Sequence, residues 1–392
     1  LMKPDGSKHS NFSVPNSLDG SRQLVKRILS AITSESLSDV IIGLEATSVY
    51  GDNLVWFLRE DGSLSSYNKR IHVLNPKQVN KFKQAYNDLP KNDYVDSFVI
   101  ADCLRFGRIN KEVYLDDYRY KALQNLTRAR FFAVQNLVKE KQRFLNYLFK
   151  KYSTMAQEKV FSNTFSTSAL AVYEEFDSAE TLADMDLQQL TEFLIQKGKN
   201  RFPDPESVAK AIQKAARSSY RLPKTINDSV NQVLSISISS MKALESQIKA
   251  FDKAIAAQME LIPNTLTSVN GIGPVYSAGI IAEIGDINRF PNQAALAKHA
   301  GLVWSQHQSG DFEVQNTRLI KSGNRYLKYY LCEAAMSLVR CDAEYSRFYH
   351  LKYKEVNKYQ HKRALALTAR KFVRLVFRLL KDNCLYRAPE AH

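Results

Sequence analysis

The sequence lacks any long hydrophobic run, and it contains few cysteines. No stretch approaches the roughly 20 apolar residues that a membrane-spanning helix requires, so we expect a soluble protein with no membrane partner. No charged-then-apolar leader opens the chain, and no long repeat or low-complexity tract is evident. The four cysteines lie too far apart for the paired spacing of a zinc site, which indicates reduced thiols of a bacterial cytoplasmic protein. They are Cys103, Cys332, Cys341 and Cys384.

The chain carries a large excess of positive charge. Lys and Arg number 55 against 40 Asp and Glu, which gives a formal net charge of +15 and indicates affinity for nucleic acid. The excess lies within aromatic-rich helical segments, at residues 128–151 and 352–387, rather than in a tail. A solvated basic face without a partner remains an alternative interpretation.

The length of 392 residues exceeds what one hydrophobic core usually serves, so we expect several domains. Residues 1–117 alternate strand and helix patterns, with strands expected at residues 40–44 and 71–74 and an extended segment at residues 9–14. Helices are expected at residues 20–34, after Tyr50 and from Pro76. This pattern predicts an α/β domain with a mixed sheet.

The remainder of the chain is typical of an all-α protein. Residues 118–260 contain two long helical segments, and in the second of them apolar residues recur every seven positions. The recurring residues are Leu234, Met241, Ile248 and Ile255, with Leu244 and Phe251 interleaved. We expect a long antiparallel coiled coil capped by short helices over residues 161–222, followed by a mainly helical domain over residues 261–392.

Three acidic residues of the first domain are candidate metal ligands. Glu45 closes an apolar strand, and the carboxyl ends of such strands are where open α/β folds bind ligands. Asp93 and Asp96 are three residues apart, which places both in the first turn of one helix. Together these carboxylates offer the hard oxygen ligands that Mg²⁺ prefers. Ordinary strand-end and helix-start acids, the latter favoured by the helix dipole, remain the alternative.

Two features of the last domain are candidate phosphate contacts. Gly271 and Gly273 precede a helix, as in the turn of a helix-hairpin-helix, whose exposed amides bind phosphate oxygens. A plain helix connector would have the same pattern. Farther along, Ser309 precedes a glycine in a loop followed by Arg318, Lys321 and Arg325.

The loop serine has the surroundings that a nucleophilic hydroxyl requires. Attack on a phosphate needs an accessible hydroxyl and cations that hold the phosphoryl oxygens. Ser-Gly in a loop is also an ordinary turn signal. His307 would be a base for Ser309, or a plain surface histidine.

Four blocks of the sequence, in order, resemble the DEDD-type transposases of the insertion-sequence-110 group, which are related to site-specific invertases and are described as bridge-RNA-guided recombinases. The first block is GLEATSVY at residues 43–50, and the second is NP at 75–76 followed by KNDYVD at 91–96. The third is GIGP at 271–274, and the fourth is QSG at 308–310 with KSGN at 321–324, which adds Asn324 to the candidate nucleic-acid contacts.

The resemblance implies a fold and a set of roles. The first domain is similar to RuvC resolvase, an RNase H-like fold with four acids, and Glu45, Asp93 and Asp96 fall on the second, third and fourth. The first acid belongs to a strand that the family places before the start of this sequence. In the similar transposase domain, Ser309 would be the covalent nucleophile. Trp304 stands where relatives commonly carry proline.

The resemblance also implies partners. The family works as a multimer associated through its coiled coil, and a structured guide RNA pairs with donor and target DNA. We therefore expect a recombinase that cuts and rejoins DNA with Ser309 and Mg²⁺-binding acids. A metal-dependent Holliday-junction-type nuclease without a covalent step and a non-catalytic architectural binder are the alternatives.

Overall fold

The computed structural model describes most of the chain, in two compact units, Leu1–Leu115 and Asp116–His392. The described residues are 1–46, 49–86, 89–90, 92–107, 118–158, 160–199, 202–305, 308–309, 312–313 and 318–387. Among them no helix is long and apolar enough to cross a membrane.

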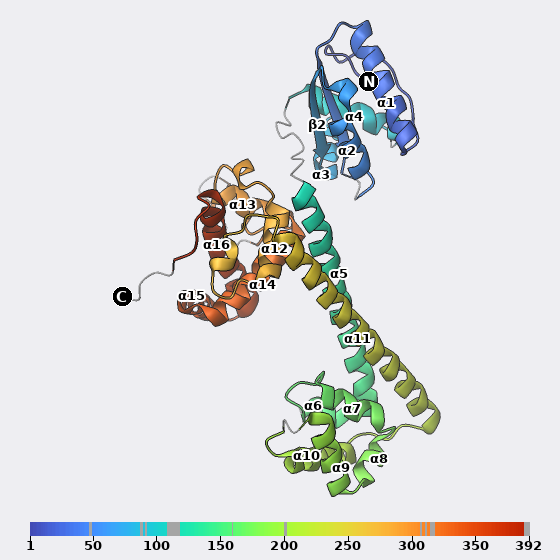
Figure 1. Ribbon diagram of the computed structural model, residues 1–392, viewed down its shortest axis with the longest axis vertical. Coiled ribbons are helices and arrows are strands. Elements are labelled where there is room, and N and C mark those ends of the chain that lie inside the picture. Colours follow the sequence, from blue (N-terminus) through green and yellow to red (C-terminus); the bar gives the residue numbers. More distant parts are fainter. Residues whose placement is uncertain are drawn as a thin grey trace. The chain divides into compact units, whose positions relative to one another are not determined.

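The described residues of the first unit form two parallel strands and four α-helices (Figure 1). In chain order they are α1 (Leu18–Ser34), β1 (Asp39–Glu45), α2 (Asp52–Glu60), β2 (Asn68–Leu74), α3 (Pro76–Lys83) and α4 (Asp93–Arg105), with a 3₁₀ turn at Gly62–Leu64 before β2. β1 pairs with β2 in parallel from Asp39 opposite Asn68 to Glu45 opposite Leu74. The connection through α2 makes a βαβ unit, as parallel neighbours require.

The two strands separate two small hydrophobic clusters. Val25 and Ile28 of α1, Leu58 of α2 and Ile71 of β2 belong to one cluster. A second cluster brings Leu74 at the end of β2 together with residues of α3 and α4, namely Val79, Val95, Val99 and Leu104. Alternate side chains of a strand point to opposite faces, so β2 contributes to both clusters.

The prediction of a mixed sheet needs correction, because the described residues contain only the parallel pair β1-β2 in this unit. The expected extended segment at residues 9–14 forms no strand. Met2 and Lys8, just before this segment, form an isolated antiparallel bridge. Pro15 follows at once and has no N–H to donate to a ladder, so the segment leads directly into α1.

The second unit is organised by two long helices, α5 (Tyr118–Lys151) and α11 (Lys224–Met259), which lie side by side (Figure 1). Polar contacts join them along their length: Arg130 with Asp252, Lys141 with Glu245, and Glu140 with Ser237. Arg119 of α5 also donates to the carbonyl of Leu261, just beyond the end of α11. The residue number rises along α5 as it falls along α11, so the pair is antiparallel. Of the heptad residues, Leu234, Met241 and Ile255 are buried. Coiled-coil packing in the strict sense stays a prediction.

Five short helices form a cap at one end of the helix pair. They are α6 (Ser153–Gln157), α7 (Thr167–Glu175), α8 (Ala179–Asp184), α9 (Leu187–Gly198) and α10 (Pro205–Arg217). Asp186 and Asp204 accept backbone hydrogen bonds at the starts of α9 and α10 and cap these helices. The cap and the adjoining ends of α5 and α11 share one hydrophobic core.

The other end of the helix pair carries a second helical core. Its elements are 3₁₀ turns at Leu266–Ser268 and Ile287–Arg289, helices α12 (Pro274–Ile284), α13 (Gln293–His299), α14 (Arg325–Cys341), α15 (Ala343–Lys354) and α16 (Gln360–Lys381), and short strands β3 (Gln308–Ser309) and β4 (Phe312–Glu313). Tyr330 and Phe372 are fully buried in this core. This helical body supports the segment that contains Ser309.

Candidate catalytic and nucleic-acid-binding sites

Glu45 is the last residue of β1, where the sequence predicted it. Its register partner is Leu74, whose carbonyl accepts a hydrogen bond from the next residue, Ala46, at 2.9 Å. Glu45 is half-buried. The strand therefore holds this carboxylate at the end of the sheet, within reach of solvent.

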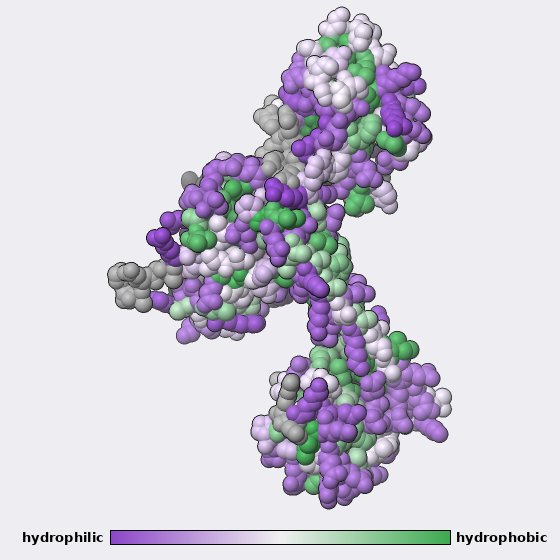
Figure 2. Space-filling view, viewed as in Figure 1, coloured by the Kyte–Doolittle hydropathy of each residue, from purple (hydrophilic) through white to green (hydrophobic). Residues whose placement is uncertain are grey.

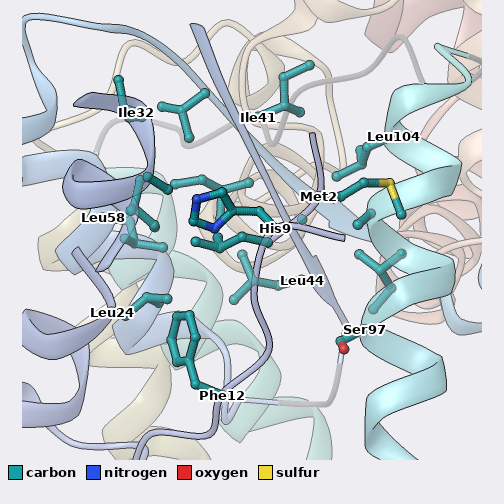
Figure 3. Close-up of a pocket in the computed structure, with 18 of the residues that line it drawn as sticks. Met2, His9, Phe12, Leu24, Ile32, Ile41, Leu44, Leu58, Ser97 and Leu104 are labelled. Atoms are coloured by element: carbon teal, nitrogen blue, oxygen red, sulfur yellow. The ribbon is translucent and has the colours of Figure 1, made fainter. Parts of the chain in front are cut away.

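A cavity of about 1040 Å³ lies along β1 (Figure 3). Every residue of β1 from Asp39 to Glu45 lines it, because within the described residues β1 pairs only with β2 and its other edge faces the cavity. The remaining walls come from parts of residues 1–16, from α1 and residues 35–38, from residues 50–51 and α2, and from α4, which contributes Ser97. The lining is largely apolar, with Ile41 and Leu44 from the strand itself (Figure 3).

Asp93 and Asp96 occupy the first turn of α4, as predicted. Asn92 caps the helix by accepting a hydrogen bond from the Val95 N–H at 2.8 Å. Asp93 is exposed, whereas Asp96 Oδ1 lies 2.7 Å from the ammonium of Lys83 on α3. The helix N-terminus and this ammonium both place positive charge beside the carboxylate of Asp96.

A second polar contact holds α3 against α4 near this pair. The hydroxyl of Tyr86 donates to Asp102, and Arg105 donates to the same carboxylate at 2.8 Å. Burial, and then the hydrogen bond to Asp102, raises the pKa of Tyr86 to about 12. Tyr86 therefore stays protonated at physiological pH and acts as a donor, which helps to fix Lys83 beside Asp96.

The carboxylates suit Mg²⁺ in chemistry but are not gathered into a complete site. Hard oxygen ligands are what Mg²⁺ requires, and Glu45, Asp93 and Asp96 supply them. In the part of the chain that the structure describes, however, no group of three or more His, Cys, Asp or Glu side chains is placed to hold a metal ion. One of the three acids is paired with Lys83 instead.

The Gly271–Gly273 turn connects a 3₁₀ turn to α12, and its two glycines have different surroundings. Gly271 has φ +89°, and a Cβ there would lie 2.9 Å from the Cβ of Cys341 at the end of α14. Its carbonyl accepts from Ser337 at 2.6 Å. Gly273 caps α12, and a Cβ there would meet nothing within 4 Å. Because only three residues of 3₁₀ helix precede the turn, the helix-hairpin-helix stays a prediction.

Ser309 belongs to a two-stranded antiparallel hairpin, in which it pairs with Phe312. Its side chain lies outside the described residues, as do His307 and Gly310. The stem below the hairpin is described. The Ser305 N–H donates to the Arg318 carbonyl at 2.8 Å, and the Ile320 N–H donates to the Val303 carbonyl at 3.0 Å. These bonds bring the basic segment back beneath the serine hairpin.

Two glycines allow the chain to cross itself at the base of this stem. Gly301 has φ +69°, and a Cβ there would lie 2.6 Å from the carbonyl oxygen of Ser322. Gly323 has φ +124°, and its Cβ would lie 2.6 Å from the Cα of Gly301. Backbone approaches this close tolerate no side chain, so both positions require glycine. The crossing joins the strand that enters the hairpin to the segment that leaves it.

A buried ionic network holds the same base from below. The side chain of Glu283 on α12 is fully buried, and Arg128 of α5 donates to it through Nε at 2.7 Å and through a terminal nitrogen at 2.9 Å. Asn324 Nδ2 donates to the same carboxylate at 2.6 Å. Paired, hydrogen-bonded burial is the condition under which a charge persists in a protein interior. The network thus ties the long helix α5 to the segment after the hairpin.

Asn324 is engaged inside the protein at both ends of its amide. Besides its bond to Glu283, its Oδ1 accepts from the N–H groups of Tyr326 and Leu327 at 3.0 and 3.1 Å and caps α14. Its own N–H donates to the His299 carbonyl at 2.7 Å. These contacts of Asn324 are all internal, and its contact with nucleic acid stays a prediction.

The three predicted basic residues of this region all lie at the surface. Arg318, Lys321 and Arg325 are exposed, the first at the stem, the second just before the glycine crossing and the third at the start of α14. The structure therefore gathers three cations around the hairpin stem. Sequence reasoning missed Glu283 and Arg128, although a lone acid within the apolar helix α12 was a signal that could have found the first.

Comparison with known families finds two family models that match successive parts of the chain. The family model described as transposase of the DEDD type, IS110, matches residues 1–152, and the model described as transposase IS116/IS110/IS902 family matches residues 264–350. The first match contains Glu45, Asp93 and Asp96, and the second contains the serine hairpin and the glycine crossing.

Two curated proteins are similar in sequence. An insertion element IS116 uncharacterized 44.8 kDa protein of Streptomyces clavuligerus is 26% identical over 334 residues, which cover 82% of this chain and 79% of that protein. A probable family 20 transposase of Pseudomonas aeruginosa is 30% identical over 105 residues, covering 26% of this chain and 31% of that protein. The first similarity extends through most of both chains.

Proposed function

We propose, on the premise that this chain belongs to the IS110/IS116 family of transposases, that it is a recombinase that cuts and rejoins DNA through a serine nucleophile. The observation that carries the proposal is the presence of both family domains in order, one with the three acids and one with the serine hairpin. The cations gathered beneath the hairpin, Arg318, Lys321 and Arg325, support it.

In the proposed reaction, the Ser309 hydroxyl attacks the phosphorus of a DNA phosphodiester. A serine–phosphate ester forms, the bond from phosphorus to one deoxyribose oxygen breaks, and that oxygen takes up a proton. Rejoining is the reverse attack by a sugar hydroxyl of another strand, which releases the serine. The exposed cations hold the phosphoryl oxygens and stabilise the charge that develops on them.

We further propose that Glu45, Asp93 and Asp96 bind Mg²⁺ when nucleic acid is present. The ion would supply a Lewis acid that stabilises charge on attacking and leaving oxygens. Because the described residues do not gather a complete ligand set, the remaining ligands would come from the nucleic acid or from further residues. A homo-oligomer formed through the helix pair, and a structured guide RNA that pairs with donor and target DNA, complete the proposal.

The serine role is tested by trapping covalent adducts. Cells that express the chain with DNA and RNA of its own element would be lysed in strong detergent, and protein-linked DNA would be quantified on denaturing gels. Ser309→Ala should abolish the adduct and leave DNA retention unchanged, whereas Ser235→Ala, at an exposed serine of α11, should retain the adduct. Persistence of the adduct in Ser309→Ala would refute the role.

The same experiment separates the alternatives. A metal-dependent junction nuclease would give nicked DNA with free ends and no adduct in the unsubstituted protein. An architectural binder would give neither product, and Asp96→Asn would change binding alone. Sequencing the RNA that co-purifies tests the guide: one structured RNA supports it, and random fragments contradict it. DNA affinity should fall by roughly one decade per decade of salt for each phosphate neutralised.

A further inference from the structure

Aromatic and arginine side chains gather where α5 packs against α14. Phe131 comes from α5, and Tyr326 and Tyr329 come from α14. The centroid of the Phe131 ring lies 5.2 Å from that of Tyr326 and 4.8 Å from that of Tyr329, both edge to face. Such pairs are favourable packing geometry. Helix packing therefore accounts for Phe131 and Tyr329.

The neighbouring Phe132 is not explained in the same way. Its ring remains 45% exposed, although it also contacts Tyr326 at 6.1 Å between centroids. It is one of several hydrophobic residues at the surface of the helix pair, where Figure 2 shows such residues among hydrophilic ones. A single exposed phenylalanine is ordinary. What distinguishes Phe132 is the cation beside it.

Arg325, the first residue of α14, lies over this aromatic group. Its guanidinium carbon is 4.7 Å from the ring centroid of Tyr326 and 5.5 Å from that of Phe132. It also donates to the Tyr326 hydroxyl at 2.7 Å. Nearby Arg128 is neutralised by Glu283, but in the described ranges no carboxylate pairs with Arg325. An exposed ring and an uncompensated, oriented cation thus stand side by side.

This combination matches the chemistry of an unpaired nucleotide. A base that has left the double helix presents a flat aromatic face, which stacks on an exposed ring, and its phosphate pairs with a guanidinium. A base in an intact duplex is covered on both faces by its neighbours, so duplex DNA offers the phosphate alone. Arg318 and Lys321 extend the positive charge from Arg325 toward the stem of the serine hairpin.

We propose that Phe132, Arg325 and Tyr326, here called the aromatic platform, bind an unpaired nucleotide of single-stranded DNA, with its base against Phe132 and its phosphate on Arg325. The inference rests on the proposed function and deepens it, because it specifies which form of DNA the transposase domain holds. α14 starts directly after the glycine crossing, so the platform adjoins the base of the hairpin that carries Ser309.

The test compares two forms of DNA with the full-length protein. Fluorescence anisotropy would measure binding of a labelled 12-nucleotide oligothymidine and of a 12-base-pair duplex at one fixed salt concentration. Stacking of one base on an aromatic ring is worth enough to change affinity by roughly tenfold. Phe132→Ala should therefore weaken oligothymidine binding about tenfold and duplex binding less than twofold. Phe132→Tyr keeps an aromatic ring and should bind oligothymidine as tightly as the unsubstituted protein.

The matched control is Phe149→Ala, because Phe149 lies on the same helix and is 47% exposed, and it should change neither affinity. If Phe132→Ala does not fold, Phe132→Trp serves instead, since a base stacked on indole quenches its fluorescence and a duplex does not. Equal oligothymidine affinity for Phe132→Ala and the unsubstituted protein would overturn the inference, as would absence of quenching.

Two further outcomes are distinguishable. If the unsubstituted protein binds neither DNA, the proposed function fails, rather than the platform alone. If Phe132→Ala lowers the molar mass by light scattering and leaves DNA affinity unchanged, the ring is a contact between copies of the chain, and the platform is refuted.

Discussion

The two units use acidic side chains in opposite ways. In the first, Asp93 is exposed and Asp96 has a half-exposed side chain paired with one lysine. In the second, Glu283 is fully buried and accepts hydrogen bonds from Arg128 and Asn324. A carboxylate with free oxygens is available to a ligand, whereas one whose oxygens are all engaged fixes the protein itself.

Burial and the number of hydrogen-bond donors around a carboxylate therefore distinguish an acid available to a ligand from a structural acid better than residue type does. The first unit presents charge at the end of a strand and the start of a helix, where solvent and ligands reach it. The second unit uses charge to hold the base of the serine hairpin. Substitutions at the two places should therefore have different effects: loss of stability in the second unit, and altered ligand binding in the first.

The largest effect is expected for Glu283→Ala. Removing the fully buried carboxylate takes away the acceptor of the Asn324 amide and of Arg128, whose side chain is 35% exposed, which should lower the free energy of unfolding of the second unit by about 2–4 kcal/mol. Asp93→Ala, at an exposed acid, should change it by less than about 0.5 kcal/mol. Urea unfolding followed by circular dichroism measures both. A loss of unfolding free energy below about 1 kcal/mol for Glu283→Ala would show that the buried acid contributes little more to stability than the exposed one.

Gly301→Ala should come next, because it combines positive φ with a clash. Its Cβ would lie 2.6 Å from the Ser322 carbonyl, whereas Gly107 of the first unit has nearly the same φ, +67° against +69°, and nothing within 4 Å. Gly107→Ala should cost about 1–2 kcal/mol from φ alone, and Gly301→Ala distinctly more. Thermal unfolding compares them. Equal losses of stability in the two variants would show that the backbone at the glycine crossing can shift to accommodate a Cβ.

Lys151 of the second unit is a buried basic side chain whose hydrogen-bond acceptor is a backbone carbonyl rather than a carboxylate. It is 2% exposed and donates to Tyr173 at 3.0 Å. Burial lowers its pKa from 10.5 to about 8, partly offset by Asp177. Between pH of about 8 and 10.5, Lys151 is protonated in the unfolded chain and neutral in the folded protein. The free energy of unfolding should therefore rise as the pH increases through this range.

The contribution of Lys151 should be on the order of 2–3 kcal/mol, since one unit of pKa is worth roughly 1.4 kcal/mol. Urea unfolding at pH 7.5 and pH 10 measures it, and the gain in stability between these two pH values should be smaller by this amount in Lys151→Met than in the unsubstituted protein. Parallel slopes in the two proteins would contradict the pKa assignment.

The smallest effect is expected at the ion pair of the first unit. Lys83→Met removes the cation that competes for Asp96 and should tighten Mg²⁺ binding by about threefold to tenfold in calorimetric titration. Lys77→Met, at an exposed lysine of the same helix, should leave the affinity unchanged. Unchanged or weaker binding in Lys83→Met would show that Asp96 does not contact the ion.

Local sequence patterns predicted much of the architecture. The apolar run before Glu45 and the Asn92 cap before Asp93 specify β1 and the start of α4 through contacts within a few residues. The seven-residue repeat indicated the long helix α11, and the antiparallel pairing with α5 follows from the contacts between them. In each case the information lies close together in the chain.

The parts that were not predicted depend on distant partners. Glu283 and Arg128 are 155 positions apart, so no local pattern connects them. The KSGN block made Asn324 a candidate nucleic-acid contact, and only the folded chain brings its amide against Glu283. The pairing of Asp96 with Lys83 is likewise a product of how α3 packs on α4.

The antiparallel helices α5 and α11 separate two cores that share no buried residue. Leu123 belongs to one core and Leu148 to the other, and a helix rises about 1.5 Å per residue, so roughly 38 Å of rigid rod stands between them. A partner bound to the cap is thereby held at a fixed distance from Ser309. Inserting one helical turn into each of the two helices would increase the distance between the cap and the second core by about 5.4 Å.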